Sequence, residues 1–169
     1  KRIEAMTLAV SPKGNLVAIG GFRNVPSPGQ ILGKEEPELA LLDLQQRKYV
    51  RIIFPASSNS MSWSPDGTSL AVAGVSDFDV YDMRSGEQLA HQLMEHESHL
   101  TVRYSPDGKY LVLSSYTGLN EGLGVQIWDA QATRLLQTIA GNAAGIAISR
   151  DSRYLAIAKR GRIEIWQFK

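Results

Sequence analysis

The chain has 169 residues, 43% hydrophobic and 21% charged, which is enough for one packed domain with a water-exposed surface. Its 18 Lys and Arg residues nearly balance its 17 Asp and Glu residues, so the net charge of +1 provides no long-range field for nucleic acid or anionic membrane. The chain contains no cysteine, which excludes disulfides and thiolate metal sites, and no apolar run approaches the roughly 20 residues of a membrane-spanning helix.

A short turn phrase recurs four times, and each copy lies between two apolar segments. The copies are Ser11-Pro-Lys-Gly14, Ser64-Pro-Asp-Gly67, Ser105-Pro-Asp-Gly108 and Ser149-Arg-Asp-Ser152. Pro fixes φ and Gly accepts positive φ, so each phrase predicts a tight turn. The expected first strands are residues 6–10, 61–63, 100–104 and 146–148, and the expected second strands are residues 16–19, 70–73, 111–113 and 155–158.

An aliphatic-aromatic-polar signature follows the second strand of most repeats and predicts a third strand. It reads Leu41-Leu42-Asp43, Val80-Tyr81-Asp82, Ile127-Trp128-Asp129 and Ile165-Trp166-Gln167. Fourth strands are expected at 49–54, 89–93 and 135–139, and helical periodicity is absent. A unit of about 40–45 residues with Trp-Asp at its end is typical of propeller blades. We therefore predict an all-β fold, a β-propeller of four-stranded meanders with blades at about 1–54, 55–93, 94–139 and 140–169, the last lacking its outer strand.

These repeats resemble the WD-repeat β-propeller family, most closely over Ser105 to Asp129 and Ser64 to Asp82. No Gly-His dipeptide precedes the first strands, so the chain is similar to a degenerate, bacterial-style member. The resemblance implies that first strands line the channel. It also implies that the loops joining fourth to first and second to third strands form the face used for partners. Asp66 and Asp107 are expected to cap turns, and Trp128 and Trp166 to anchor the core.

The repeats differ most between their second and third strands, where residues 22–38 and 116–124 are inserted. Long loops on a rigid scaffold carry function more often than other segments, although a tolerated surface insertion is the alternative. Lys159-Arg160-Gly161-Arg162 falls on the same expected face, either as an anion-binding group or as a solvated hairpin tip. The candidate partner-binding residues are Arg23, Asn24, Ile31, Lys34, Asp77, Phe78, His96, His99, Tyr116, Asn120, Lys159, Arg160 and Arg162.

The chain carries no nucleophile elbow, no phosphate-binding glycine loop with Lys and no His-Glu-x-x-His. The sequence therefore predicts a non-catalytic scaffold that binds a protein or peptide. It predicts no cofactor and no metal, and neither nucleic acid nor membrane as a partner. The alternative is a propeller enzyme or an accessory or gating domain, lactonase-like or peptidase-associated. Asp77, Asp79, Glu121 and the histidines would then contribute a metal-assisted site.

The sequence contains four sets of first, second and third strands but three fourth strands, so the ring is expected to be incomplete as it stands. Three interpretations remain open: part of a longer propeller with its complementary segment upstream of Lys1, a homodimeric ring, or a self-contained ring or arc. An open arc would leave Met6, Leu8 and Val10 uncovered. We expect the chain to associate with a second copy or a complementary segment.

Overall fold

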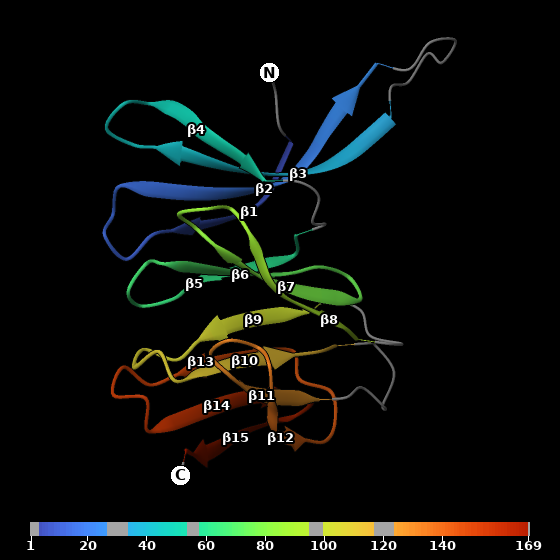
Figure 1. Cartoon of the computed structure of the whole chain (residues 1–169). Helices are drawn as coiled ribbons and strands as arrows, with labels where there is room; N and C mark the ends of the chain where they lie inside the picture. The colour runs from blue at the N-terminus through green and yellow to red at the C-terminus, as the bar shows by residue number, and fades with distance from the viewer. Residues whose placement is uncertain (1–3, 27–33, 54–57, 95–99, 117–123, 169) are drawn as a thin grey trace.

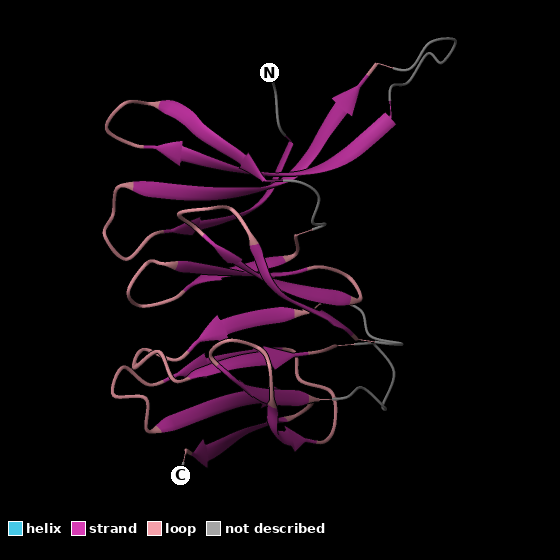
Figure 2. Cartoon of the chain, in the orientation of Figure 1, coloured by secondary structure: helices cyan, strands magenta, loops and turns pink. Residues whose placement is uncertain are grey.

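The computed structural model describes residues 4–26, 34–53, 58–94, 100–116 and 124–168. These residues form four antiparallel sheets and contain no helix, and hence none long and apolar enough to cross a membrane (Figure 2). Each sheet is a meander of consecutive strands, which confirms the predicted all-β propeller fold. The sheets are called blades 1 to 4 below.

The blades follow one another along the chain. Blade 1 holds β1 (Glu4–Val10), β2 (Leu16–Val25), β3 (Lys34–Asp43) and β4 (Lys48–Ile53). Blade 2 holds β5 (Ser60–Trp63), β6 (Ser69–Ala73), β7 (Asp77–Asp82) and β8 (Gln88–Leu93). Blade 3 holds β9 (Thr101–Tyr104), β10 (Tyr110–Ser114), β11 (Val125–Asp129) and β12 (Leu135–Ile139). Blade 4 holds β13 (Gly145–Ile148), β14 (Tyr154–Lys159) and β15 (Arg162–Gln167).

The blades stack face to face from the N-terminal end to the C-terminal end (Figure 1). Successive first strands, β1 with β5, β5 with β9 and β9 with β13, pack beside one another along the inner side of the stack. Fourth strands lie at the far edge of blades 1, 2 and 3. The result is an arc of blades with their first strands on the inside, as expected for part of a propeller.

Three apolar clusters hold neighbouring blades together. The cluster between blades 1 and 2 includes Leu39, Leu41 and Trp63, whose indole Nε1 donates to the carbonyl oxygen of Ala9 at 2.9 Å. The cluster between blades 2 and 3 is built around Phe78, and that between blades 3 and 4 around Ile127 and Leu155. Blade-on-blade packing of this kind makes each sheet depend on its neighbour for burial of its apolar faces.

The repeated Ser-x-Asp turns are stabilised by their own side chains. Asp66 accepts hydrogen bonds from the hydroxyl of Ser64 at 2.6 Å and from the amide of Thr68 at 3.0 Å. Ser105 with Asp107, and Ser149 with Asp151, form the same 2.6 Å bond. The bond from Ser64 is the main cause that lowers the pKa of Asp66 below its usual value. The expectation that Asp66 and Asp107 are structural turn residues is confirmed.

The aromatic residue of the third strand bonds to the side chain two residues before it. Tyr81 donates to Asp79 at 3.2 Å, Trp128 to Gln126 at 3.0 Å and Trp166 to Glu164 at 3.2 Å. Trp128 also meets Phe78 edge-on at 5.5 Å, which confirms it as a core anchor between blades. Trp166 is 38% exposed, so the same expectation for Trp166 was wrong. No fourth strand pairs with β15 in the part of the chain described, and the indole is left partly open.

The outer faces of the first and last blades are exposed. Met6, Leu8 and Val10 on β1 are 60–68% exposed, as predicted for an open arc. At the other end, Ile163 and Ile165 on β15 are more than 60% exposed. Blade 2, between these ends, buries apolar side chains on both faces, with Phe78 and Val80 toward blade 3 and Trp63 and Tyr81 toward blade 1. Both end faces are therefore able to take part in further contacts.

Candidate protein-binding face

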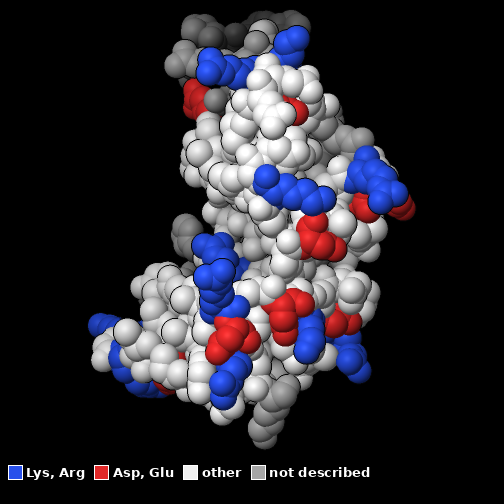
Figure 3. Space-filling view, turned by 90° about the vertical axis from the view of Figure 1, so that its left-hand side faces the viewer, with Lys and Arg blue, Asp and Glu red and all other residues white. Residues whose placement is uncertain are grey.

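The two sides of the stack differ in what joins the strands. On one side lie the Ser-x-Asp turns and the hairpins from third to fourth strands, where acidic and basic side chains are interspersed (Figure 3). Asp43 and Asp82 close these hairpins by accepting the backbone amides of residues two and three positions later. On this side, the hydrogen-bonding groups of the turns are thus paired with neighbouring residues, and the mixed charges produce no strong electrostatic field of one sign.

The other side carries the ends of the second strands and the beginnings of the third strands, and is called the loop face (Figure 1). In blade 2, Gly74 and Ser76 form a tight connection, because the Gly74 amide donates to Asp77 and the Met94 amide to Ser76. In blade 4, Arg160 and Gly161 alone join β14 to β15, with Gly161 at a φ of 75°. The blades therefore present connections of unequal length on one rigid face.

The longest of these connections begins on an arm formed by the paired ends of β2 and β3. Their register runs without a break from Leu16 opposite Asp43 to Val25 opposite Lys34. Arg23 holds the arm together, since its guanidinium lies 2.8 Å from Glu38 and 3.2 Å from Glu36. The arm is thus an ordered projection that carries Asn24 and Lys34 into solvent (Figure 1).

The structure sorts the sequence-predicted partner residues into exposed and internal groups. Asn24, Lys34, Tyr116, Arg160 and Arg162 are exposed, and the Arg162 guanidinium also pairs with Glu164 at 2.7 Å. Arg23 and Lys159 are engaged within the fold: Arg23 on the arm, and Lys159 with Glu164 at 2.9 Å and the carbonyl oxygen of Ala140 at 2.8 Å. Ile31, His96, His99 and Asn120 lie outside the described residues, as does Glu121 of the alternative metal site.

Phe78 is not a surface residue, and its assignment as a partner contact was wrong. The side chain is fully buried in the cluster between blades 2 and 3. Alternation along β7 explains the error: Phe78 and Val80 point toward blade 3, while Asp77, Asp79 and Tyr81 point the other way. Asp77, which begins the same strand, is half-buried.

Two exposed apolar residues on the loop face were missed by the sequence analysis. Val75 lies in the blade 2 connection and Leu93 ends β8, opposite Asp77 in the register, with exposures of 51% and 70%. Both stand in segments without an insertion, so a search for divergent loops passed over them. Their signal in the sequence was an apolar residue at a strand end, where the turn chemistry predicts polar residues.

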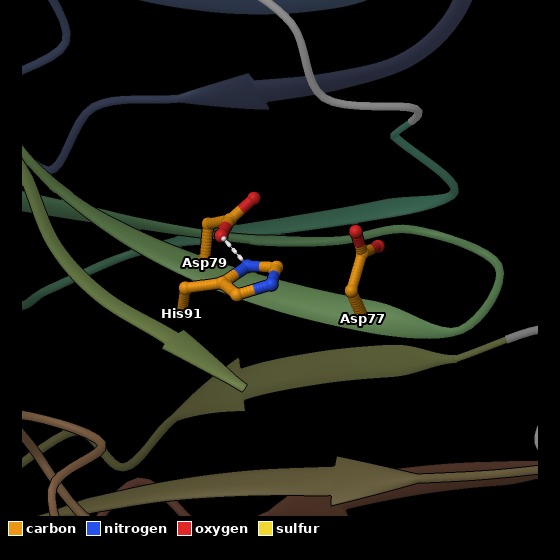
Figure 4. Close-up of side chains that lie close together, drawn as sticks. All are labelled: Asp77, Asp79 and His91. Carbon is orange, nitrogen blue, oxygen red and sulfur yellow. Dashed lines mark hydrogen bonds and ion pairs between the residues drawn. The ribbon is translucent and has the colours of Figure 1, made fainter. Parts of the chain in front are cut away.

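Asp77, Asp79 and His91 form a group in blade 2 between β7 and β8 (Figure 4). His91 Nδ1 lies 2.7 Å from Asp79 Oδ1, and one ligand atom from each residue falls within 4.8 Å of the others. Burial raises the pKa of Asp77, and the charge of Asp79 adds to this effect. Oxygen and imidazole ligands suit a divalent cation, so this is the group with metal-ligand chemistry in the described residues.

Asp79 also has a structural role that needs no metal. It accepts from Gln88 Nε2 at 2.6 Å and from the hydroxyl of Tyr81, which is the blade 2 form of the repeated aromatic pair. The alternative metal-assisted site expected from the sequence included Asp77, Asp79 and the histidines, but the sequence alone did not pair His91 with Asp79. The pairing of β7 with β8 places His91 opposite Asp79, and that register could have been found by counting from the hairpin at Asp82.

Comparison with known proteins identifies both a fold and a family. Hydrazine synthase from Kuenenia stuttgartiensis matches 99% of this chain with a TM-score of 0.73 and 15% sequence identity, a likeness that shows the fold alone. The chain spans about half of that protein, covering 47% of its length. No curated protein sequence matches the chain significantly. The family model of the eukaryotic translation initiation factor eIF2A matches residues 29–140, which is more than half of the chain. The chain therefore belongs to the eIF2A family.

Proposed function

We propose that the chain is a non-catalytic scaffold of the WD-repeat type, which binds a protein or peptide partner through its loop face. The observation that carries the proposal is that each of the four blades presents an exposed apolar or cationic side chain on this face. Val75, Leu93 and Tyr116 supply apolar contact, while Lys34 and Arg160 supply positive charge. Interfaces of this composition combine a desolvated apolar centre with a charged rim.

The chemistry of the face favours an apolar segment flanked by acidic residues. Arg160 is exposed in the blade 4 hairpin, whereas its neighbour Arg162 pairs with Glu164 at 2.7 Å, and Lys34 ends the arm of blade 1. Guanidinium groups bind carboxylates with directional hydrogen bonds, which gives specificity at the rim. The family's name is that of a translation initiation factor, so protein components of the translation apparatus are the first partners to test.

The test compares two sets of variants in capture of partners from a translation extract. One replaces residues 24–35 with a short Gly-Ser turn, leaving the ion pairs of Arg23 with Glu36 and Glu38 in place. The other combines Val75→Ser with Leu93→Ser. Both variants should keep the thermal stability of the parent and lose the captured protein. Leu44→Ser, at an exposed apolar residue of the opposite side, is the matched control and should retain it.

Capture that survives both changes would overturn the proposed face. Nuclease treatment of the extract separates protein from RNA, because a partner held through RNA would be lost on digestion. With 18 positive against 17 negative residues, we expect the nuclease to make no difference.

A second candidate function is that of a metal-dependent enzyme or an accessory domain of one, favoured by the group of Asp77, Asp79 and His91. Thermal denaturation with Mn²⁺, Zn²⁺ or Ca²⁺ discriminates it from the scaffold. Stabilisation by one cation that disappears in both Asp77→Asn and His91→Gln would favour the enzyme. An unchanged melting temperature with every cation would leave the scaffold as the function.

A further inference from the structure

The hydrogen bonds of Asp79 determine which nitrogen of His91 carries the proton. Asp79 Oδ1 accepts from Gln88 Nε2 at 2.6 Å and lies 2.7 Å from His91 Nδ1, while its Oδ2 accepts from the Tyr81 hydroxyl at 3.2 Å. Because both oxygens accept from amide and hydroxyl donors, the carboxylate is ionised, and its contact with the ring requires the proton on Nδ1. The lone pair on Nε2 of the neutral imidazole is then available as a metal ligand.

The imidazole of His91 lies between two carboxylates (Figure 4). Nδ1 faces Asp79, and Nε2 is on the side of Asp77. One ligand atom from each of the three residues falls within 4.8 Å of the others. Two ligands of one transition-metal ion stand up to about 4 Å apart, because each bond to the metal is about 2 Å long. Small side-chain adjustments would therefore bring the group to metal-binding distances.

The carboxylate of Asp77 is half-buried and forms no hydrogen bond within the residues that the structure describes. Burial, and then the nearby charge of Asp79, raise its pKa. Carboxylates taken out of water are normally paired with a positive group or coordinate a metal. A cation beside Asp77 would therefore compensate a negative charge that the surrounding side chains leave without a hydrogen bond.

The pairing of β7 with β8 holds the three residues in place. Asp79 lies opposite His91, and Asp77 lies opposite Leu93. Asp77 and Asp79 are two positions apart on one strand, so their side chains leave the same face of the sheet as that of His91. Both strands belong to a blade with four strands, and the group involves neither end of the arc.

We propose that Asp77 and Nε2 of His91 bind one divalent transition-metal ion, with Asp79 as the residue that positions the imidazole. A carboxylate that receives a hydrogen bond from the second nitrogen of a metal-bound histidine is a common arrangement at such sites. The nitrogen ligand favours Zn²⁺ or Co²⁺ over Mg²⁺ and Ca²⁺, which take oxygen ligands. This inference names a metal for the group that favours the second candidate function. It assigns no reaction, and it does not require partner capture by the loop face.

The test is a titration of the chelator-treated chain with Zn²⁺ and with Co²⁺. Calorimetry should show binding of both ions and none of Mg²⁺. In the proton NMR spectrum of the Co²⁺ complex, the Nδ1–H of His91 should give a strongly shifted signal, because the unpaired electrons of Co²⁺ act on nearby protons. This signal should disappear in deuterated water, since the proton exchanges. Absence of binding, or binding without the exchangeable signal, would refute the proposal.

Matched histidine variants locate the ion. The chain has three histidines, so the double variant His96→Gln with His99→Gln leaves His91 alone and should retain both the binding and the shifted signal. Asp77→Asn and His91→Gln should each weaken binding by at least about tenfold, and His91→Gln should also remove the signal. Binding that survives His91→Gln, or that is lost in the double variant, would place the metal elsewhere.

Asp79→Asn tests the positioning role. Asparagine keeps an oxygen that can accept from Nδ1–H but removes the charge, so the affinity for Co²⁺ should fall by about tenfold. The shifted Nδ1–H signal should also broaden through faster exchange with water, which a purely structural role of Asp79 would not cause. An unchanged affinity and signal would overturn this role. Because no partner is present in these titrations, failure of metal binding and failure of the loop face to capture a partner are separate results.

Discussion

Blades 3 and 4 are copies of one repeat, but a fourth strand is described in blade 3 alone. Their comparison separates the stability that arises within a repeat from the stability that depends on other strands. Both have the Ser-x-Asp turn with its 2.6 Å bond, and both have a third-strand tryptophan bonded two residues back. In blade 3 these features lie within a packed core, with Ser105 and Ala132 fully buried. In blade 4 the corresponding tryptophan is open to solvent and a groove stands beside it.

The difference shows that the hydrogen bonds within a repeat form without the outer strand. Burial of the third-strand aromatic residue, in contrast, requires that strand. The Ser and Asp of each turn are neighbours in sequence, so their geometry is fixed by the turn itself. Trp128 is covered by residues of another strand and another blade, including Phe78 at 5.5 Å. In blade 4, the ring of Phe168 stacks on Tyr110 of blade 3 at 5.1 Å, which provides some aromatic packing between the two blades.

The largest expected contrast is between the two tryptophans. Trp128→Ala should lower the free energy of unfolding by about 3 kcal/mol, because it leaves a cavity between blades 2 and 3. Trp166→Ala should cost about 1 kcal/mol or less, because its indole is already partly hydrated. Urea denaturation followed by circular dichroism measures both. Equal losses would mean that the groove is not a real difference between the blades.

A strand supplied to blade 4 should remove most of that contrast. A copy of residues 132–140 appended directly after Lys169 begins four residues after Trp166, which reproduces the spacing from Trp128 to Ala132. Covering the indole and the groove should raise the free energy of unfolding by about 2 kcal/mol. The control carries proline at the position of Leu136 in the copy. If both extended chains melt like the parent, β15 does not accept a fourth strand.

The repeat pattern was sufficient to predict the blades and turns, including a last blade with three strands in the described residues, because each depends on neighbours in sequence. Turn residues such as Asp66 bond within two positions, and alternation assigns the faces of a strand. The faces of β7 were nevertheless misjudged at Phe78, whose burial depends on Trp128 of the next blade. Partners across blades are set by stacking, which a repeat alone does not specify.

The candidate site was harder to predict for the same reason. Its exposed cations, Lys34 and Arg160, were found from loop length and charge. Val75 and Leu93 were missed because they flank a short connection, and exposure depends on what the neighbouring blade covers. His91 meets Asp79 only through the pairing of β7 with β8. The residues that were predicted could be recognised from the local sequence, whereas the others depend on which strands and blades pair in the fold.

A smaller contrast is expected between the turn serines of the two blades. Ser105→Ala removes a buried hydroxyl that donates to Asp107 and accepts from the Tyr110 amide at 2.9 Å. Loss of such a group should cost about 1–2 kcal/mol. Ser149→Ala breaks equivalent bonds at a half-buried position, where water replaces them, and should cost less than half as much. Thermal melts of both variants, with Ser105→Thr as a hydroxyl-retaining control, decide whether burial governs the difference.

The smallest expected effect depends on pH and concerns the residue beneath each tryptophan. Blade 3 has neutral Gln126 there and blade 4 has Glu164, whose pKa is held at about 2 by hydrogen bonds from Lys159, Arg162 and Trp166. A carboxyl with a lowered pKa in the folded chain contributes stability that is fully present above its ordinary pKa near 4.5 and is lost as pH falls through about 2.

Glu164→Gln makes blade 4 resemble blade 3 and should slightly lower the melting temperature at pH 7. The difference from the parent should shrink between pH 4.5 and pH 2, and high salt should reduce it at neutral pH because solvent screens these pairs at the sheet edge. A deficit that stays constant over this pH range would show that Glu164 acts by packing, as Gln126 does, and that its charge contributes nothing to the blade.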